Sequence, residues 1–213
     1  MTEPRAPEAG GNLAGLWLDC YERLAAAAAH EVNNALNGVA MNLEVVRLRA
    51  TPGADAGRVA PFAAASAEAH EATVALVGAL VALGRAPRPA VAVDVAEVVG
   101  HAAVLFAPLL RHRGVTLVVE NGSEARTPTA APARAVRLAV CAALEAAQTA
   151  APRDSGDDPS RILRCTVHAT DRPILAVVPA PAAWDDDTRA ALAATGVLAT
   201  RAPDGLRVAF PPA

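Results

Sequence analysis

The sequence contains no lysine and few aromatic residues. All 19 of its permanently cationic side chains are arginine, and they nearly balance 22 acidic ones, for a formal net charge of −3. Aromatic side chains make up 3% of the 213 residues and hydrophobic residues 53%, so alanine, valine and leucine must form the core. A slightly acidic chain without a basic block is a poor match for nucleic acid or an anionic membrane, so neither is expected as a partner.

Cysteine and long apolar runs are scarce as well. Cys20, Cys141 and Cys165 are odd in number, far apart and without a CxxC pair, which excludes a disulfide scaffold and a zinc site. Polar residues interrupt every apolar stretch before the roughly 18 residues that a membrane span requires. Residues 1–11 lack the basic-then-apolar order of a signal peptide. We therefore expect a reduced, cytoplasmic protein.

Two helical patterns follow a polar tail at residues 1–12. No proline occurs from residue 13 to residue 50, and apolar residues recur in steps of three and four, which predicts one long amphipathic helix. Turn residues at 51–57 break the pattern. A second helix is expected over residues 59–83. Its heptad positions are Phe62, Ser66, Ala69, Thr73, Leu76, Leu80 and Leu83.

These helices predict a hairpin over residues 13–86 that serves as the dimerisation unit. Each helix carries an apolar face that one partner helix cannot cover. Two hairpins packed as a four-helix bundle would bury both faces, so we expect a homodimer. Placing a charge at a heptad position, as in Leu76→Asp, is expected to split the dimer into monomers.

Residues 87–213 differ in composition and predict an α+β domain. Asp94 and Glu97 form a capping-box pattern for a helix that ends near Arg113, with Gly114 as its left-handed cap. Further helices are expected at 132–149 and 186–195, and strands at 115–119, 162–168, 174–178, 197–200 and 206–210. This order predicts a mixed sheet with helices over one face.

The most informative stretch is HEVNNALN, residues 30–37, inside the first helix. His30 and Glu31 lie off the apolar face, toward solvent, and Asn34 follows His30 by one turn on the same side. A carboxylate that holds one ring N–H raises the nucleophilicity of the other ring nitrogen, and an amide can orient a water or a phosphoryl oxygen. His30, Glu31 and Asn34 are therefore the candidate catalytic residues.

This stretch resembles the phosphoacceptor box of dimeric histidine kinases, which reads His-Glu-Leu, then Arg or Asn, Asn or Thr, Pro and Leu. The matching positions are His30, Glu31, Val32, Asn34 and Leu36. Ala35 replaces the proline that usually kinks the family's helix, which predicts a straighter helix here. The resemblance spans about residues 13–210 and implies that residues 87–213 correspond to the family's ATP-binding domain, a Bergerat-type α/β sandwich.

The family's nucleotide motifs are missing from that second half. Glu145 aligns with an Asn that helps to hold Mg²⁺ in the family, and VPAPAAW at 178–184 replaces an Asp-x-Gly-x-Gly turn. The Gly-rich lid is absent, because the helix at 186–195 follows almost directly. Without backbone N–H groups freed by glycine, a triphosphate has no cradle. We expect a degenerate histidine kinase ATPase-like domain that binds no ATP.

The whole chain resembles the histidine phosphotransferases of the ChpT type. The resemblance implies that His30 takes a phosphoryl group from the aspartate of one receiver domain and passes it to another. Glu31 would hold the ring tautomer and Asn34 would help to place the phosphoryl group. No cofactor is expected on this chain, because the Mg²⁺ for transfer would come with the receiver.

Two other functions remain open. A pseudo-histidine-kinase could dock on a response regulator or a kinase and regulate it without phosphotransfer. An active autokinase is disfavoured by the missing nucleotide turn. A HExxH zinc protease is excluded because Asn34 stands where the second His belongs.

The other histidines, the cysteines and the acidic cluster receive structural interpretations. His70 also precedes a Glu, but Val74 stands where Asn34 would match. His101, His112 and His168 have no partners at ligand spacing and receive no role. Cys141 and Cys165 are interpreted as small core residues, and the acidic run at 185–187 as a helix cap rather than a metal site.

Overall fold

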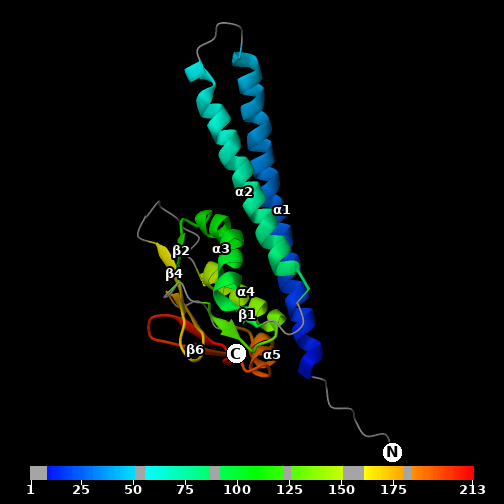
Figure 1. The fold of residues 1–213 in the computed structure, drawn as a ribbon, viewed down its shortest axis with the longest axis vertical. Coiled ribbons are helices and arrows are strands. Elements are labelled where there is room, and N and C mark those ends of the chain that lie inside the picture. Colours follow the sequence, from blue (N-terminus) through cyan, green and yellow to red (C-terminus); the bar gives the residue numbers. More distant parts are fainter. Residues whose placement is uncertain (1–8, 51–55, 87–91, 122–125, 151–160, 180–183) are drawn as a thin grey trace, which may run out of the picture.

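The computed structural model confirms the α+β class, with a long helical hairpin beside a mixed sheet and its helices (Figure 1). It describes residues 9–50, 56–86, 92–121, 126–150, 161–179 and 184–213. Several predicted features lie outside the described residues. They are the first part of the tail at 1–8, most of the turn at 51–57, the segment at 87–91 where the second domain is expected to begin, and the loop at 151–160.

The hairpin consists of α1 (Ala9–Arg49) and α2 (Ala60–Gly84), with the short 3-10 helix η1 (Ala56–Arg58) just before α2. α1 begins inside the predicted tail and continues without a break through Ala35. The seven predicted heptad positions of α2 are all buried or half-buried within a single chain, so this face, which was expected to need a second hairpin, is already covered here. At the far end of the hairpin, the Arg49 guanidinium lies 4.8 Å from the centre of the Phe62 ring.

Both helices of the hairpin also expose apolar faces. Leu36 and Leu43, one heptad apart on α1, are 47% and 53% exposed. On α2, Val74, Val77 and Val81 follow i, i+3, i+7 spacing and are 58%, 46% and 49% exposed. These exposed side chains lie on one face of each helix, because steps of three, four and seven residues return to the same side of a helix.

By length and composition alone, α2 would also suit a membrane span. In the hairpin, its heptad face is buried or half-buried. Of its most apolar 18-residue segment, 17% is buried inside the fold. The prediction that polar residues interrupt every apolar stretch is therefore weakest for α2. Its only acidic residues are Glu68 and Glu71.

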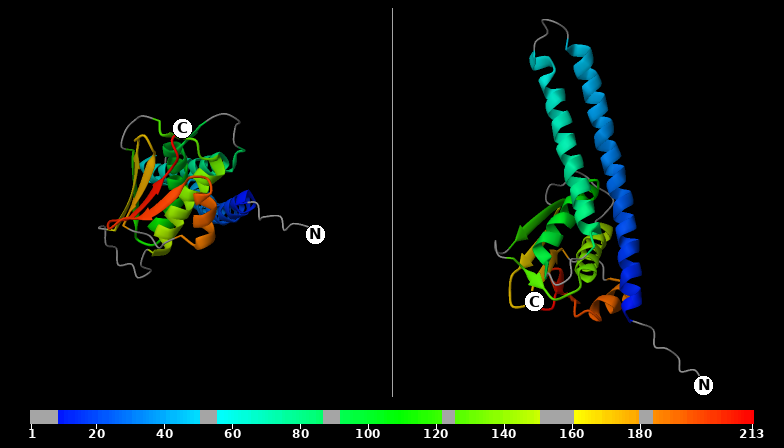
Figure 2. Two further views of the ribbon diagram at one scale, coloured as in Figure 1. Left: turned by 90° about the horizontal axis from the view of Figure 1, so that it is seen from below. Right: turned by 45° about the vertical axis from the view of Figure 1, so that its right-hand side comes forward.

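The body is a five-stranded sheet with three helices over one face (Figure 2). The helices are α3 (Val95–Arg111), α4 (Ala133–Ala150) and α5 (Asp186–Ala193). The strands, in spatial order, are β2 (Thr116–Asn121), β4 (Ile162–His168), β5 (Ile174–Val178), β7 (Leu206–Ala209) and β6 (Leu198–Arg201). β2 and β4 are parallel and the other pairs antiparallel. Alternate residues of β4 are buried, because only one face meets the helices.

A small second sheet joins the start of α3 to the segment before α4. β1 (Val93–Asp94) pairs antiparallel with β3 (Pro128–Thr129), a two-residue strand that the sequence does not predict. Asp94 is the N-cap of α3, as predicted, and accepts from the backbone N–H of Ala96 at 3.0 Å and from the Thr127 hydroxyl at 2.9 Å. This carboxylate therefore both begins α3 and holds the neighbouring segment.

The predicted glycine cap at Gly114 is confirmed, and α5 ends in the same way at Gly196. Gly114 and Gly196 have φ of 67° and 79°, in the left-handed region that follows α3 and α5. After each glycine, the next N–H returns to the helix, from Val115 to Leu110 O and from Val197 to Leu192 O. This Schellman pattern ends both helices sharply and sends the chain directly into β2 or toward β6.

The body packs on the half of the hairpin that is nearest the N-terminus. α1 lies against α4 and α5, and α2 lies against α3. The buried residues of α1 are Leu13, Trp17, Cys20, Leu24 and Ala28, and all of them belong to the core that continues into the body. The other half of the hairpin extends beyond the body (Figure 1). The residues around His30 therefore lie near the point where the hairpin leaves the body.

Candidate functional site

His30 is an exposed residue near the middle of α1. The alanines of residues 25–29 favour the helix strongly and bring little bulk of their own. Asn34 is exposed one turn further on, on the same side as predicted. Within the described part of the chain, no hydrogen bond or ion pair engages the His30 ring, so the imidazole is open to a partner molecule.

Glu31 differs from the prediction, since it does not point to solvent. Its side chain is only 12% exposed, and its Oε1 lies 3.1 Å from Nε2 of His112. Its partner lies at the end of α3, which the local pattern cannot anticipate.

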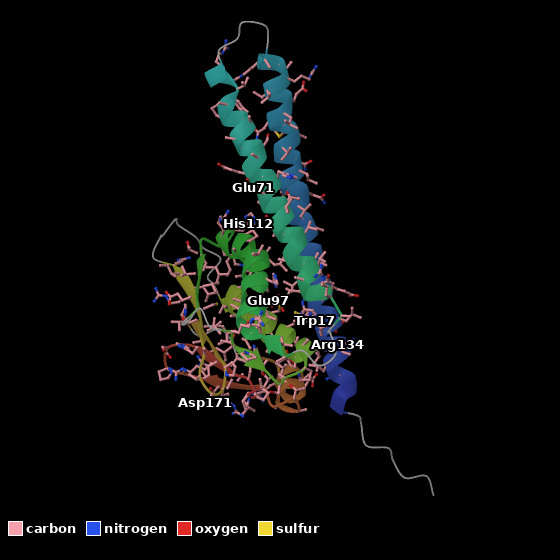
Figure 3. All side chains as sticks on the ribbon, viewed as in Figure 1. Trp17, Glu71, Glu97, His112, Arg134 and Asp171 are labelled. Atoms are coloured by element: carbon pink, nitrogen blue, oxygen red, sulfur yellow. The ribbon has the colours of Figure 1, made fainter. Side chains whose placement is uncertain are left out.

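His112 therefore has a partner, although the sequence assigned it no role. It is the C-cap residue of α3, and its ring is 64% exposed apart from the contact with Glu31. Figure 3 shows it at the end of α3, beside the hairpin. The two residues are 81 positions apart, so no spacing in the sequence could have signalled the contact.

The remaining histidines lie elsewhere. His70 is exposed on α2 and is followed by Glu71, with Val74 one turn beyond it, also exposed. His168 is exposed at the end of β4. His101 is half-buried in a hollow of about 250 Å³ that Arg85, Glu97 and Arg137 also line, where α2 meets the starts of α3 and α4.

Glu145, the position aligned with the family's Mg²⁺-binding Asn, is bound to the hairpin. Both of its carboxylate oxygens accept from Arg23 of α1, from Nε at 2.9 Å and from Nη2 at 2.9 Å. The bidentate contact with Glu145 raises the pKa of the Arg23 guanidinium. This carboxylate thus joins α4 to α1, a contact across 122 positions that the sequence does not signal.

The segment expected to replace the nucleotide-binding turn is described only at its two ends, since residues 180–183 lie outside the described residues. Trp184 is buried, and its indole N–H has no acceptor among the described groups. Asp185 follows at once as the N-cap of α5, accepting from the Thr188 N–H at 2.7 Å. That hydrogen bond lowers the pKa of Asp185.

The acidic run at 185–187 is thus confirmed as a helix cap. Among the described residues, no group of three or more His, Cys, Asp or Glu side chains converges as a metal site would require. A hollow of about 450 Å³ lies between α1, α4 and α5, and Arg23, Glu145 and Asp185 are among its lining residues.

All three cysteines are buried and none forms a disulfide. The thiols of Cys20 and Cys141 are in contact where α1 crosses α4, and this contact together with burial raises the pKa of Cys141. Burial alone raises the pKa of Cys165 from 9.0 to about 12. The interpretation of Cys141 and Cys165 as small core residues is confirmed.

We predict a corresponding loss of stability in alkali. The folded pKa of Cys165 exceeds its unfolded value near 9.0, so its contribution to stability is complete below pH 9 and is lost as the pH rises toward about 12. Urea titrations should give a free energy of unfolding that falls between pH 8 and pH 10.5. A Cys165→Ala variant should lose less over the same interval. An equal loss in both proteins would contradict the assignment to Cys165.

Comparisons with known proteins give fold-level similarities only. No protein-family model and no curated protein sequence matches this chain. Among solved structures, the Acinetobacter baumannii histidine kinase AdeS is similar with a TM-score of 0.43 and 12% identity, over 85% of this chain and 97% of that chain. A structure described as a bacterial phosphotransferase gives a TM-score of 0.46 and 13% identity, over 90% and 95%. ShkA, solved at full length in complex with AMPPNP, is similar with a TM-score of 0.38 and 18% identity, over 90% of this chain and 46% of that chain.

Proposed function

We propose that this chain is a histidine phosphotransfer protein of a two-component phosphorelay, with His30 as the carrier of the phosphoryl group. The observation that carries the proposal is the placement of His30. It is an exposed imidazole, without a partner in the described part of the chain, with Asn34 one turn away on the same side. The partners would be the receiver domains of response regulators, which hold the group on an aspartate.

From this chain, the transfer needs only a nucleophilic ring nitrogen, because the receiver brings the aspartyl phosphate and the Mg²⁺. The ring nitrogen of His30 that carries no hydrogen attacks the phosphorus, a P–N bond forms, and the P–O bond to the aspartate breaks. The aspartate leaves as a carboxylate, and the proton on the other ring nitrogen remains or passes to a neighbouring base. The reverse reaction with a second receiver regenerates the free imidazole. Asn34 would orient the phosphoryl oxygens.

We propose that the chain performs this transfer without ATP. The position aligned with the family's Mg²⁺-binding Asn holds Glu145, whose two oxygens are already bonded to Arg23. Mg²⁺ would be supplied by the receiver. The chain itself would carry no cofactor.

A cytoplasmic homodimer is the expected state of the protein. The exposed apolar faces of α1 and α2, at Leu36 and Leu43 and at Val74, Val77 and Val81, suit a four-helix bundle of two hairpins. A receiver would then dock on the bundle near His30, with the end of α3 close by. Neither nucleic acid nor a membrane is part of the proposal.

One observation favours a second function, a pseudo-histidine-kinase that docks on a response regulator or kinase and regulates it without phosphotransfer. Glu31, the carboxylate of the phosphoacceptor pattern, contacts His112, and no contact with the ring of His30 accompanies it in the described residues. If phosphoryl acceptance requires a hydrogen bond between Glu31 and His30, the chain would bind receivers without accepting a phosphoryl group. The role of Glu31 in holding the His30 tautomer stays a prediction.

A labelling experiment distinguishes these functions. The purified chain is mixed either with ³²P-labelled receiver domains from the same genome or with γ-labelled ATP and Mg²⁺. We expect label from at least one receiver, with the acid lability and base stability of phosphohistidine, and none from ATP. Stable binding to a receiver without label would favour the docking function. Label from ATP would establish an autokinase and contradict the proposal.

A further inference from the structure

The contact between Glu31 and His112 joins the phosphoacceptor helix to the body of the protein. Glu31 directly follows the exposed His30 in α1, but its own side chain is only 12% exposed. A carboxylate with so little access to water depends on hydrogen-bond donors from the protein. Among the described residues, the donor is His112, whose Nε2 lies 3.1 Å from Oε1 of Glu31.

The backbone that carries His112 is held on both sides. The His112 N–H donates to Pro108 O at 3.1 Å, and Gly114 turns the chain into the left-handed cap directly afterwards. The neighbouring Arg113 donates from Nη1 to Gln148 O at 2.7 Å, which ties the end of α3 to the end of α4. The ring of His112 is therefore presented to α1 from a fixed support.

We infer that His112 is a positioning residue for phosphoryl transfer at His30, acting through Glu31. This inference rests on the proposed function. When the P–N bond to His30 forms and the P–O bond to the receiver aspartate breaks, the imidazole gains positive charge. The Glu31 carboxylate, on the next residue of the helix, makes no hydrogen bond to that ring among the described residues, so it stabilises this charge through its fixed negative charge alone. A carboxylate whose orientation is already fixed needs no rearrangement during the step. His112 supplies that fixed orientation, so the α+β body takes part in the reaction without binding a nucleotide.

The inference is specific to His112 among the histidines of the body. His168 is just as clearly at the surface, at the end of β4, and it contacts no residue of the phosphoacceptor stretch in the described structure. Its replacement by alanine removes the same side chain from an exposed position. His168→Ala is therefore the matched control.

The test measures single-turnover transfer from a labelled receiver by rapid quench, at several receiver concentrations. We expect His112→Ala to lower the maximal transfer rate constant about tenfold or more, with half-saturation little changed. His112→Gln, whose amide can still donate to the carboxylate, should recover most of the rate. His168→Ala should match the wild type.

A double variant then separates positioning from a general loss of structure. If His112 acts through Glu31, the variant Glu31→Gln with His112→Ala should be no slower than Glu31→Gln alone. If the double variant is slowed by the product of the two single effects, the two residues act independently and the inference is overturned. A wild-type rate constant in His112→Ala would overturn it as well. If no receiver labels the wild-type chain, the proposed function fails and the positioning role fails with it. If the wild type is labelled and only the His112 results are negative, the proposed function stands alone.

Discussion

Replacing His30 by alanine will abolish phosphoryl acceptance from every receiver that labels the wild-type chain. The reaction needs a ring nitrogen with a free lone pair at the surface, and alanine leaves no nucleophile at that position. Because the His30 side chain is exposed and no described residue bonds to it, the substitution should leave the fold intact, with stability changed by no more than about 0.5 kcal/mol. Autoradiography of the variant after incubation with a labelled receiver measures the loss, and circular dichroism checks the fold.

His70 offers the matched control for this experiment. It is an exposed histidine on the other helix of the same hairpin, and a glutamate, Glu71, follows it as Glu31 follows His30. Val74 takes the place that Asn34 has in the phosphoacceptor stretch. His70→Ala should therefore accept phosphate as the wild type does. If label persists in His30→Ala and disappears in His70→Ala, the phosphoryl group is carried by His70 on α2 and not by His30.

Aspartate at two neighbouring positions of α2 will have two different, large effects. Leu76 is 7% exposed within a single chain, so Leu76→Asp places a carboxylate in the contact between α1 and α2 and should cost about 3 kcal/mol or more in stability. Val77 is 46% exposed on the uncovered face. Val77→Asp should leave the hairpin folded and shift the chain from dimer to monomer.

Light scattering after size exclusion measures the mass of each variant, and urea titration measures its stability. The sequence alone makes Leu76 the residue whose change splits the dimer. The structure makes Val77 the sharper probe, because the side chain of Leu76 is used inside the chain. A monomeric wild type, or a Val77→Asp variant that stays dimeric, would contradict a bundle built on this face of α2.

Much of the architecture was accessible from local sequence patterns. The steps of three and four over residues 13–50 and the heptad positions of α2 predict the hairpin, because a helix must place its apolar side chains on one face. Asp94, Gly114 and Gly196 mark helix ends through the backbone groups that they cap or the left-handed conformation that they allow. Such signals depend on residues a few positions apart, and a sequence displays them directly.

Boundaries and short strands were less accessible. α1 begins at Ala9 within a segment rich in glycine, where helix propensity is low, and the structure extends it along the body. β3 has only two residues, Pro128 and Thr129. A strand of that length has no alternation to detect, and its pairing with β1 depends on the fold around it.

The candidate phosphoacceptor, His30 with Asn34 one turn away, can be read from the local sequence, since their shared side of a helix follows from helical geometry. Which groups meet across the chain depends on the three-dimensional packing. It brings His112 to Glu31 and Arg23 to Glu145 over 81 and 122 positions, and it covers a carboxylate that the helix pattern alone leaves in solvent. Burial and ion pairing depend on how the helices and the sheet pack together. That packing is set by the summed apolar contacts of the whole core, which no local spacing records.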